Sequence, residues 1–300
     1  MRPASFHISV CICTYQRPAL LKRLLTELGL LNTGGLFTYS VVIADNDAKE
    51  SALSVVEEIR AAQTVPITYC VEPRRSFSHV RNLAIAHSKG DAIAFIDDDE
   101  FPETDWLLNH YRALEEYKAD GVLGPVRPHF EAGAPDWVKR GGFYDRPEHP
   151  TGFTMSWPEC RTGNVLFRKR IVEGLDPIFR PEFATGGEDV DFFRRMVERG
   201  HKFVWCNEAV AHETVPPNRW KRSVLLKRAL QRGANSLLQT TGRRKNIVKA
   251  MVALPMYALA LPVLQLAGHH LFMKYLVKLC DHAGRLLAFV GIHPLGERQM

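Results

Sequence analysis

The sequence predicts an α/β protein with a doubly wound, mainly parallel sheet and a C-terminal helical region. Three observations predict it: strand and helix patterns alternate through the first hundred residues, polar residues stand where the strands end, and the charge balance changes near residue 215. Such alternation is typical of a parallel sheet covered by helices on both faces. The 300 residues allow one such domain with an appendage, or two modest domains.

The first hundred residues repeat a unit of strand, loop and helix. Residues 7–14 alternate β-branched and small side chains, which predicts a strand. A helix follows from Pro18, because proline is tolerated in a first turn and leucines then recur with helical spacing. The same rhythm predicts strands at 39–44, 67–71 and 92–96 and helices at 51–62 and 77–87. Ligands of such sheets bind at the carboxyl ends of the strands.

The order changes after residue 99. A long stretch without periodicity, 127–158, is expected to be a functional or mobile loop. The remaining elements are a helix at 105–117, strands at 121–126, 165–167, 203–205 and 209–212, and a helix at 189–199. We place the domain boundary at the prolines near residue 216, giving a catalytic domain at 1–217 and a C-terminal region at 218–300.

The net charge of +6 conceals two different parts. Residues 214–280 contain twelve Lys and Arg and no Asp or Glu, so the other 27 basic residues face 33 acidic ones. The 46% hydrophobic and 24% charged residues exclude a disordered, collagen-like or many-span membrane chain. The six cysteines form no C-x-x-C pair and no leader is evident, so we expect reduced thiols in a cytosolic protein.

An acidic run, Asp97-Asp98-Asp99-Glu100, follows the apolar strand at 92–96. Unpaired carboxylates repel one another, and a hard divalent cation with a diphosphate would remove that conflict. Residues at i and i+2 converge at a strand end, so Asp97 and Asp99 are the better pair of ligands. The alternative is an acidic turn that caps the following helix, and the motif alone does not separate the two readings.

A second acidic group, Glu188-Asp189, follows Gly186-Gly187. Glycines let the backbone approach a ligand, and acidic residues are favoured at a helix start, which by itself explains Asp191. Glu188 or Asp189 could serve as a general base. His212 could complete a metal site, although a lone histidine is more often structural. Arg81 could bind a phosphate, although a helix-surface arginine is usually solvated.

Five ordered motifs resemble family 2 inverting glycosyltransferases, and within them the bacterial exopolysaccharide enzymes of the succinoglycan type. The resemblance covers residues 7–213 and rests on segments that recur in the family's order. They are the segment 8–18, Ala44-Asp45-Asn46, Val80-Arg81-Asn82 followed by Gly90-Asp91, Asp97-Asp98-Asp99, and Glu188-Asp189.

The resemblance implies a GT-A fold with a Rossmann-like nucleotide-binding half. It places Thr14, Arg17, Asp45, Arg81 and Asp97 around a nucleotide-sugar donor, expected to be a UDP-sugar. Mg²⁺ or Mn²⁺ would be bound by Asp97, Asp99 and His212. Asp189 would be the catalytic base, and Glu188 would help to hold the saccharide acceptor. A single displacement would invert the anomeric carbon, so no enzyme nucleophile would be required.

The C-terminal region predicts attachment to a membrane. Residues 250–268 carry no charge but include Pro255 and Pro262, so a kinked or re-entrant helix pair is as consistent with them as a spanning helix. Residues 272–290 form an amphipathic pattern suited to a membrane surface. Basic residues are attracted to anionic lipid by about 1 kcal/mol each. The alternative is a pair of core helices packed on the catalytic domain.

These features predict a peripheral or re-entrant enzyme on the cytoplasmic side of the inner membrane. The expected acceptor is a saccharide linked to a polyprenyl diphosphate, and Arg232 could reach the donor or a lipid diphosphate. A non-catalytic nucleotide-sugar-binding or assembly protein is the alternative. The sequence has no dinucleotide or P-loop signature, and its basic block lacks the interleaved aromatics typical of nucleic-acid binding, so no nucleic-acid partner is expected.

Overall fold

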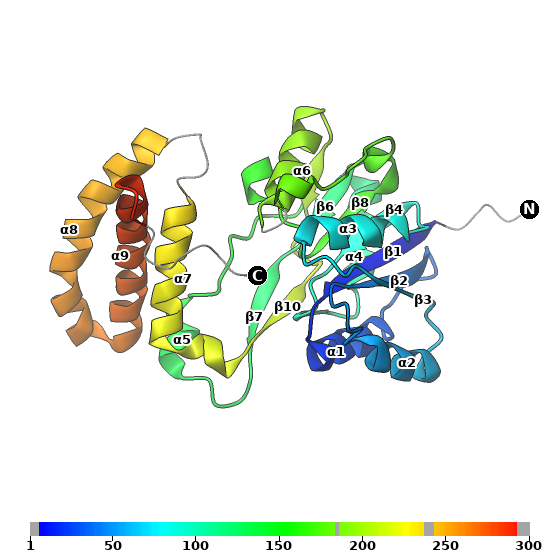
Figure 1. The fold of residues 1–300 in the computed structure, drawn as a ribbon, viewed down its shortest axis with the longest axis horizontal. Helices are drawn as coiled ribbons and strands as arrows, with labels where there is room; N and C mark the ends of the chain where they lie inside the picture. Colours follow the sequence, from blue (N-terminus) through cyan, green and yellow to red (C-terminus); the bar gives the residue numbers. More distant parts are fainter. Residues whose placement is uncertain (1–5, 184–185, 237–242, 293–300) are drawn as a thin grey trace, which may run out of the picture. The chain divides into compact units, whose positions relative to one another are not determined.

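The computed structural model describes residues 6–183, 186–236 and 243–292, whose helices and strands are shown in Figure 1. The strands are β1 (His7–Thr14), β2 (Thr38–Asp45), β3 (Ile67–Val71), β4 (Ala92–Phe95), β5 (Glu100–Pro102), β6 (Gly121–Leu123), β7 (Val126–Phe130), β8 (Val165–Arg168), β9 (Phe203–Trp205) and β10 (Ala211–Val215). The α-helices are α1 (Pro18–Leu28), α2 (Leu53–Ala62), α3 (Phe77–Ala86), α4 (Trp106–Glu116), α5 (Asp136–Gly141), α6 (Glu188–Glu198), α7 (Arg222–Asn235), α8 (Arg243–Ala267) and α9 (His269–Phe289).

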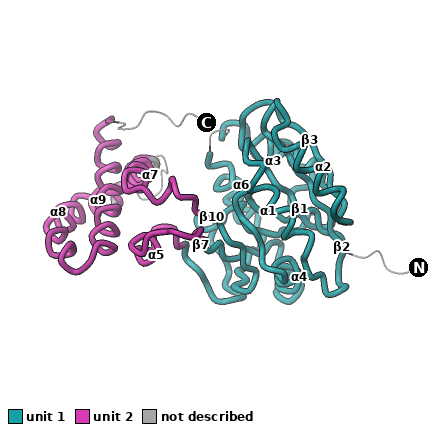
Figure 2. The backbone as a smooth tube through the Cα atoms, turned by 90° about the horizontal axis from the view of Figure 1, so that it is seen from below, with its two compact units in different colours: residues 1–127, 146–213 teal, residues 128–145, 214–300 magenta. Residues whose placement is uncertain are grey.

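Contacts divide the chain into two units (Figure 2). Unit 1 comprises residues 1–127 and 146–213, and unit 2 comprises residues 128–145 and 214–300. The second unit therefore includes part of the segment expected to be one long loop, and that segment forms most of β7 and the short helix α5. The expected division at residue 217 remains a prediction.

Unit 1 is built on a seven-stranded sheet in the order β3-β2-β1-β4-β8-β6-β9. Neighbours among β1 to β4 run parallel, and β8 runs antiparallel to both β4 and β6, so the expected mainly parallel sheet is confirmed. β1 lies between β2 and β4, and Thr14 pairs with Asp45 at the last position of the β1–β2 register. The carboxyl ends of these three strands therefore meet at one edge.

Helices cover both faces of this sheet, because the buried side chains of each strand point alternately to one face and to the other. One core cluster takes Val10 from β1 and joins it to residues of α1, α2 and α4. The other takes the adjacent Cys11 and joins it to residues of α3 and α6. Successive strand residues point to opposite faces, so continuous apolar strands need an apolar layer on each side.

Asn164, just before β8, is the polar centre of unit 1. It is fully buried, and its φ of 56° lies in the left-handed region, which asparagine tolerates better than most residues. Its Oδ1 accepts hydrogen bonds from Trp106 Nε1 at 2.6 Å and His110 Nε2 at 2.8 Å. Its Nδ2 donates to the carbonyls of Pro125 at 2.7 Å and Ala209 at 2.9 Å. One side chain thus joins four separate segments.

We expect His110 to make the stability of unit 1 fall in weak acid. Burial lowers the pKa of His110 to about 4, and its Nδ1 has no hydrogen-bond partner among the described residues. Between pH 6.5 and about 4, His110 is protonated in the unfolded chain but neutral in the folded chain. The free energy of unfolding should therefore fall as pH is lowered through this window, by up to about 3 kcal/mol.

Chemical denaturation at a series of pH values measures this effect. His110→Gln keeps a donor for Asn164 Oδ1 and should flatten the pH dependence. His87→Gln changes an exposed histidine and should retain it. An identical slope in His110→Gln and the parent protein would contradict the assignment.

Candidate active site

The acidic run at 97–100 directly follows β4, at the edge where β1 and β2 also end. Its central residue, Asp98, is buried and accepts a hydrogen bond from Thr14 Oγ1 at 2.9 Å. Arg17 Nη1 lies 2.8 Å from Asp98 Oδ1 and 3.3 Å from Asp99 Oδ2. Three expected site residues, Thr14, Arg17 and Asp99, are therefore brought together, and Asp98 connects them.

Arg81 joins the acidic run to helix α6. It lies on α3, where only 11% of its side chain is exposed. It forms an ion pair with Glu188, and its Nη2 is 3.8 Å from Asp97 Oδ1. Asp97 keeps 46% of its side chain exposed, whereas Glu188 is buried and its Oε2 has no hydrogen-bond partner among the described residues. Arg81 thus orients Glu188 and leaves Asp97 accessible.

Helix α6 begins at a glycine that the local backbone requires. Gly187, its N-cap residue, has a φ of 92°, in the left-handed region that favours glycine. This turn presents Glu188 and Asp189 in the first helical turn, where the helix dipole favours carboxylates. Asp189 is half-buried, and no ion pair involves it within the described part of the chain. Asp191, by contrast, is buried against Arg194 and Arg195.

The carboxylates at this edge are incompletely neutralised. Burial raises the pKa of Asp98 although Arg17 opposes the shift. Burial also raises the pKa of Glu100 well above its usual value, and repulsion from Asp97 adds to the effect. Because the folded pKa values lie above the unfolded ones, ionising these groups destabilises the protein as pH rises through the shifted values. A cation at this edge would offset that cost.

Two residues that the sequence did not single out complete this edge. Arg146 Nη2 is 2.5 Å from Glu213 Oε2, and its charge opposes the rise that burial causes in the pKa values of Asp97 and Glu100. It lies in a segment without periodicity, so no pattern could place it. Gly163 packs so tightly that a Cβ there would lie 2.9 Å from Asp97 Oδ2, which explains the glycine before Asn164.

Asp45 has a different environment from the expected one. It is fully buried, and its oxygens accept hydrogen bonds from the amides of Asp47 and Ala52 and from the Tyr69 hydroxyl. These contacts shape the loop after β2. They use three of the roughly four acceptor sites of the carboxylate.

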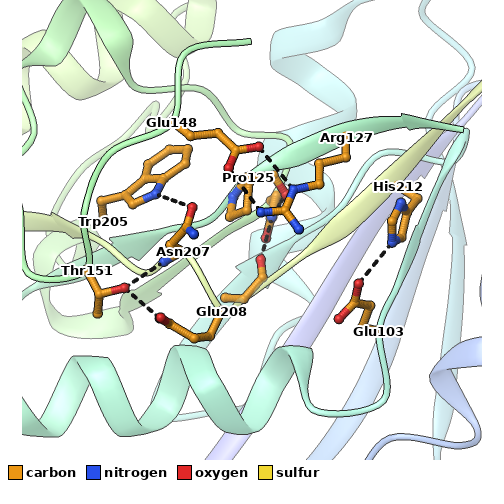
Figure 3. Close-up of polar contacts among 11 residues, drawn as sticks. Glu103, Pro125, Arg127, Glu148, Thr151, Trp205, Asn207, Glu208 and His212 are labelled. Carbon is orange, nitrogen blue, oxygen red and sulfur yellow. Dashed lines mark hydrogen bonds and ion pairs between the residues drawn. The ribbon is translucent and has the colours of Figure 1, made fainter. Parts of the chain in front are cut away.

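His212 is not brought to the aspartates. Its Nε2 lies 3.1 Å from Glu103 Oε1 (Figure 3). Its ring stacks on Phe101, with 5.3 Å between the ring centroids. The neighbouring Glu213 instead pairs with Arg146 beside Asp97. Adjacent residues of a strand point to opposite faces, so β10 directs one of the two to the site and the other away. The structure therefore gives no support to His212 as a metal ligand.

Arg232 belongs to unit 2. It lies on α7, exposed, with its Nε 2.9 Å from Asp281 Oδ1 on α9. Its expected contact with a diphosphate stays a prediction.

The carboxylates at this edge of the sheet fit a divalent cation that is also coordinated by a bound substrate. Within the described ranges, no three His, Cys, Asp or Glu side chains are grouped closely enough to hold a metal ion. The carboxylate oxygens of Asp97 and Asp99 are nevertheless the hard ligands that Mg²⁺ and Mn²⁺ prefer. Oε1 of the buried Glu100 has no hydrogen-bond partner among the described residues.

Comparisons with known proteins identify the family of this chain. The family described as "Glycosyl transferase family 2" matches residues 9–175. The succinoglycan biosynthesis protein ExoM of Rhizobium meliloti (strain 1021) is 37% identical over 243 residues, which cover 80% of this chain and 75% of that protein.

Solved structures share the fold at low sequence identity. The mannosyltransferase PcManGT of Pyrobaculum calidifontis, solved with GDP-Man and Mn²⁺, has a TM-score of 0.63 and 18% identity, covering 97% of this chain and 88% of that one. Residues 1–349 of S. aureus TarS, solved with UDP, give 0.56 and 16%, covering 95% and 92%. The sheet, the matched family and these neighbours together lead to one conclusion. The chain belongs to glycosyl transferase family 2 and is a glycosyltransferase with the GT-A fold.

Proposed function

We propose that this protein transfers a sugar from a nucleotide-sugar donor to a hydroxyl of a saccharide acceptor, with inversion at the anomeric carbon. The observation that carries the proposal is the bridge made by Arg81, which links accessible Asp97 to Glu188, next to Asp189, which has no ion pair among the described residues. Donor-binding and proton-accepting groups are thereby held on one scaffold. A single displacement needs such a pair and requires no nucleophile from the protein.

The donor would lie at the carboxyl ends of β1 and β4. Arg17 and Arg81 are positioned by Asp98 and Glu188 and would face the diphosphate. Asp97 and Asp99 would hold Mg²⁺ or Mn²⁺, which when bound stabilises negative charge on the departing nucleoside diphosphate. A UDP-sugar is the donor we favour, since the TarS neighbour was solved with UDP.

The acceptor would meet the first turn of α6. Asp189 would remove the proton of the attacking hydroxyl, because it is the half-exposed carboxylate at this turn with no arginine partner among the described residues. Glu188, whose Oε2 has no hydrogen-bond partner among the described residues, would help to hold the acceptor. Arg81 fixes the orientation of Glu188, and burial excludes water from this side of the pair.

Similarity to the succinoglycan biosynthesis protein supports a role in bacterial exopolysaccharide synthesis. We propose an acceptor saccharide linked to a polyprenyl diphosphate, with unit 2 attached to anionic lipid at the cytoplasmic face of the inner membrane. α8 supports that attachment, because its residues Asn246–Ala267 are long and apolar enough to cross a membrane and only 17% of the most apolar window is buried. Arg232 would then approach a diphosphate at the lipid surface.

We expect turnover to depend on a divalent cation. A panel of nucleotide sugars with Mn²⁺ and lipid-linked saccharides should release nucleoside diphosphate, and EDTA should lower the rate at least about 100-fold. Asp99→Asn should weaken Mn²⁺-dependent UDP binding about tenfold or more in calorimetry. Asp105→Asn is the control, because Asp105 pairs with Asn32 before α4. Full activity in EDTA would refute the metal assignment.

A further inference from the structure

Helix α8 carries an uncovered apolar surface. Large exposed side chains recur along it every three or four residues, so they form one stripe on a single face. The α8 stripe consists of Val248, Met251, Val252, Met256, Leu259, Val263 and Leu266, which are 54–90% exposed. α8 is also one continuous helix through Pro255 and Pro262, not the pair of helices that its prolines had made plausible. A contiguous apolar face of this kind marks an interaction surface.

The charges of unit 2 identify an anionic lipid surface as the occupant. Exposed cations stand at the start of α8 (Arg244, Lys249), on α7 (Lys227, Arg228) and on α9 (Lys274, Lys278). No acidic residue occurs anywhere in 214–280. A second copy of this chain would place like charges opposite one another, whereas anionic headgroups complement them.

The packing of unit 2 ties α8 to charged neighbours. α9 lies between α7 and α8 and packs against both (Figures 1 and 2). The α7–α9 crossing is backbone to backbone, since a Cβ at Gly233 would lie 1.9 Å from the Asp281 carbonyl and one at Gly284 2.1 Å from the Leu230 carbonyl. Arg232 on α7 forms an ion pair with Asp281 on α9. Arg285, one turn further along α9, pairs with the same aspartate. α9 is therefore packed tightly against α7 and also contacts α8.

This packing argues against α8 crossing a bilayer. Because α9 is paired with α8 along its length, a spanning α8 would draw α9 in with it. α9 carries Lys274, Lys278, Asp281 and Arg285, and charged side chains are costly in the hydrocarbon region. Lying in the interface buries the α8 stripe and keeps all four charges near water.

We propose that α8 lies in the plane of an anionic membrane surface, with the α8 stripe inserted among the acyl chains, and does not span the bilayer. This inference deepens the membrane attachment within the proposed function and depends on no step of sugar transfer. It identifies the partner as a lipid surface and α8 as the inserted element.

Flotation of the full chain with sealed vesicles tests the partner. The protein should float with phosphatidylcholine vesicles that contain phosphatidylglycerol, and at least about tenfold less with phosphatidylcholine alone. Leu259→Glu or Val252→Glu should reduce flotation about tenfold or more without unfolding the chain, because both side chains are exposed. Leu30→Glu is the matched control, since Leu30 is equally apolar, 64% exposed and lies in unit 1, and it should float like the parent protein.

Cysteine labelling tests the orientation. His270→Cys lies in the first turn of α9, next to its junction with α8 at Gly268, and Glu57→Cys marks the outside surface of unit 1. In sealed membrane vesicles with unit 1 outward, a membrane-impermeant maleimide should modify both, as read by peptide mass spectrometry. Protection of residue 270 until detergent is added would show that α8 spans and would overturn the proposal.

The remaining outcomes are also decisive. In one such outcome the chain fails to float and is instead a dimer by light scattering. If Leu259→Glu then makes it monomeric, a second copy covers the α8 stripe, and the lipid assignment is overturned. Neither readout measures transfer, so an inactive protein that floats and labels as expected upholds this inference while the proposed function fails.

Discussion

Asp189→Asn should abolish sugar transfer while donor binding persists. The amide keeps the size of the side chain but cannot accept the acceptor proton, and general-base catalysis typically contributes 10²–10⁴-fold to a rate. We therefore expect kcat to fall by about that factor. The Kd for UDP with Mn²⁺ should change less than about threefold, because Arg17, Asp97 and Asp99, which we propose to bind the donor and the metal, lie outside α6.

Initial rates of nucleoside diphosphate release, paired with calorimetry, separate these two effects. Glu198→Gln is the matched control, since it removes an exposed carboxylate from the other end of α6. If Asp189 had only a structural role, Asp189→Asn would lower the melting temperature and the donor affinity together. Unchanged turnover in Asp189→Asn would exclude this residue as the base.

Asn164→Ala should be the most destabilising single substitution we propose. It leaves Trp106 Nε1, His110 Nε2 and the Ala209 carbonyl buried without their Asn164 partner, and the Pro125 carbonyl keeps only its bond from the Ala211 amide. Each orphaned group costs about 1–3 kcal/mol, and alanine also fits the left-handed backbone poorly. We expect the free energy of unfolding of unit 1 to fall by about 4 kcal/mol or more.

Denaturant unfolding followed by tryptophan fluorescence measures this change. Asn109→Ala serves as the control, because its exposed amide donates one hydrogen bond to the Glu208 carbonyl. It should cost no more than about 1 kcal/mol. Equal effects of the two substitutions would show that Asn164 is not a structural centre.

Most of the sheet was predictable because its strands and helices are long and periodic. The elements of the first hundred residues lie where leucine spacing and β-branched alternation put them, and the helix at 189–199 matches α6. The short elements β5 and α5 were not predicted. They have three and six residues, which are too few to show a periodic pattern. Their positions depend on partners distant in sequence, as β5 on β10.

The sequence predicted which residues lie at the candidate site better than it predicted what each of them contacts. Spacing favoured Asp97 and Asp99 over Asp98, and Asp98 is indeed the buried residue that Thr14 and Arg17 bind. Nothing in the sequence indicated that Asp45 bonds to its own loop, or that Arg146 from an aperiodic segment joins the aspartates.

The sequence by itself determined the order of strands and helices, the polar residues at the strand ends and the contrast between an acidic catalytic part and a basic apolar tail. These follow from local periodicity and composition. Only the tertiary structure decided that Arg81 bridges Asp97 and Glu188, that His212 faces away from them, and that α9 binds α8 to α7. Those facts depend on strand pairing, side-chain alternation and backbone contact at Gly233 and Gly284. Such contacts join residues distant in sequence, so no local pattern encodes them.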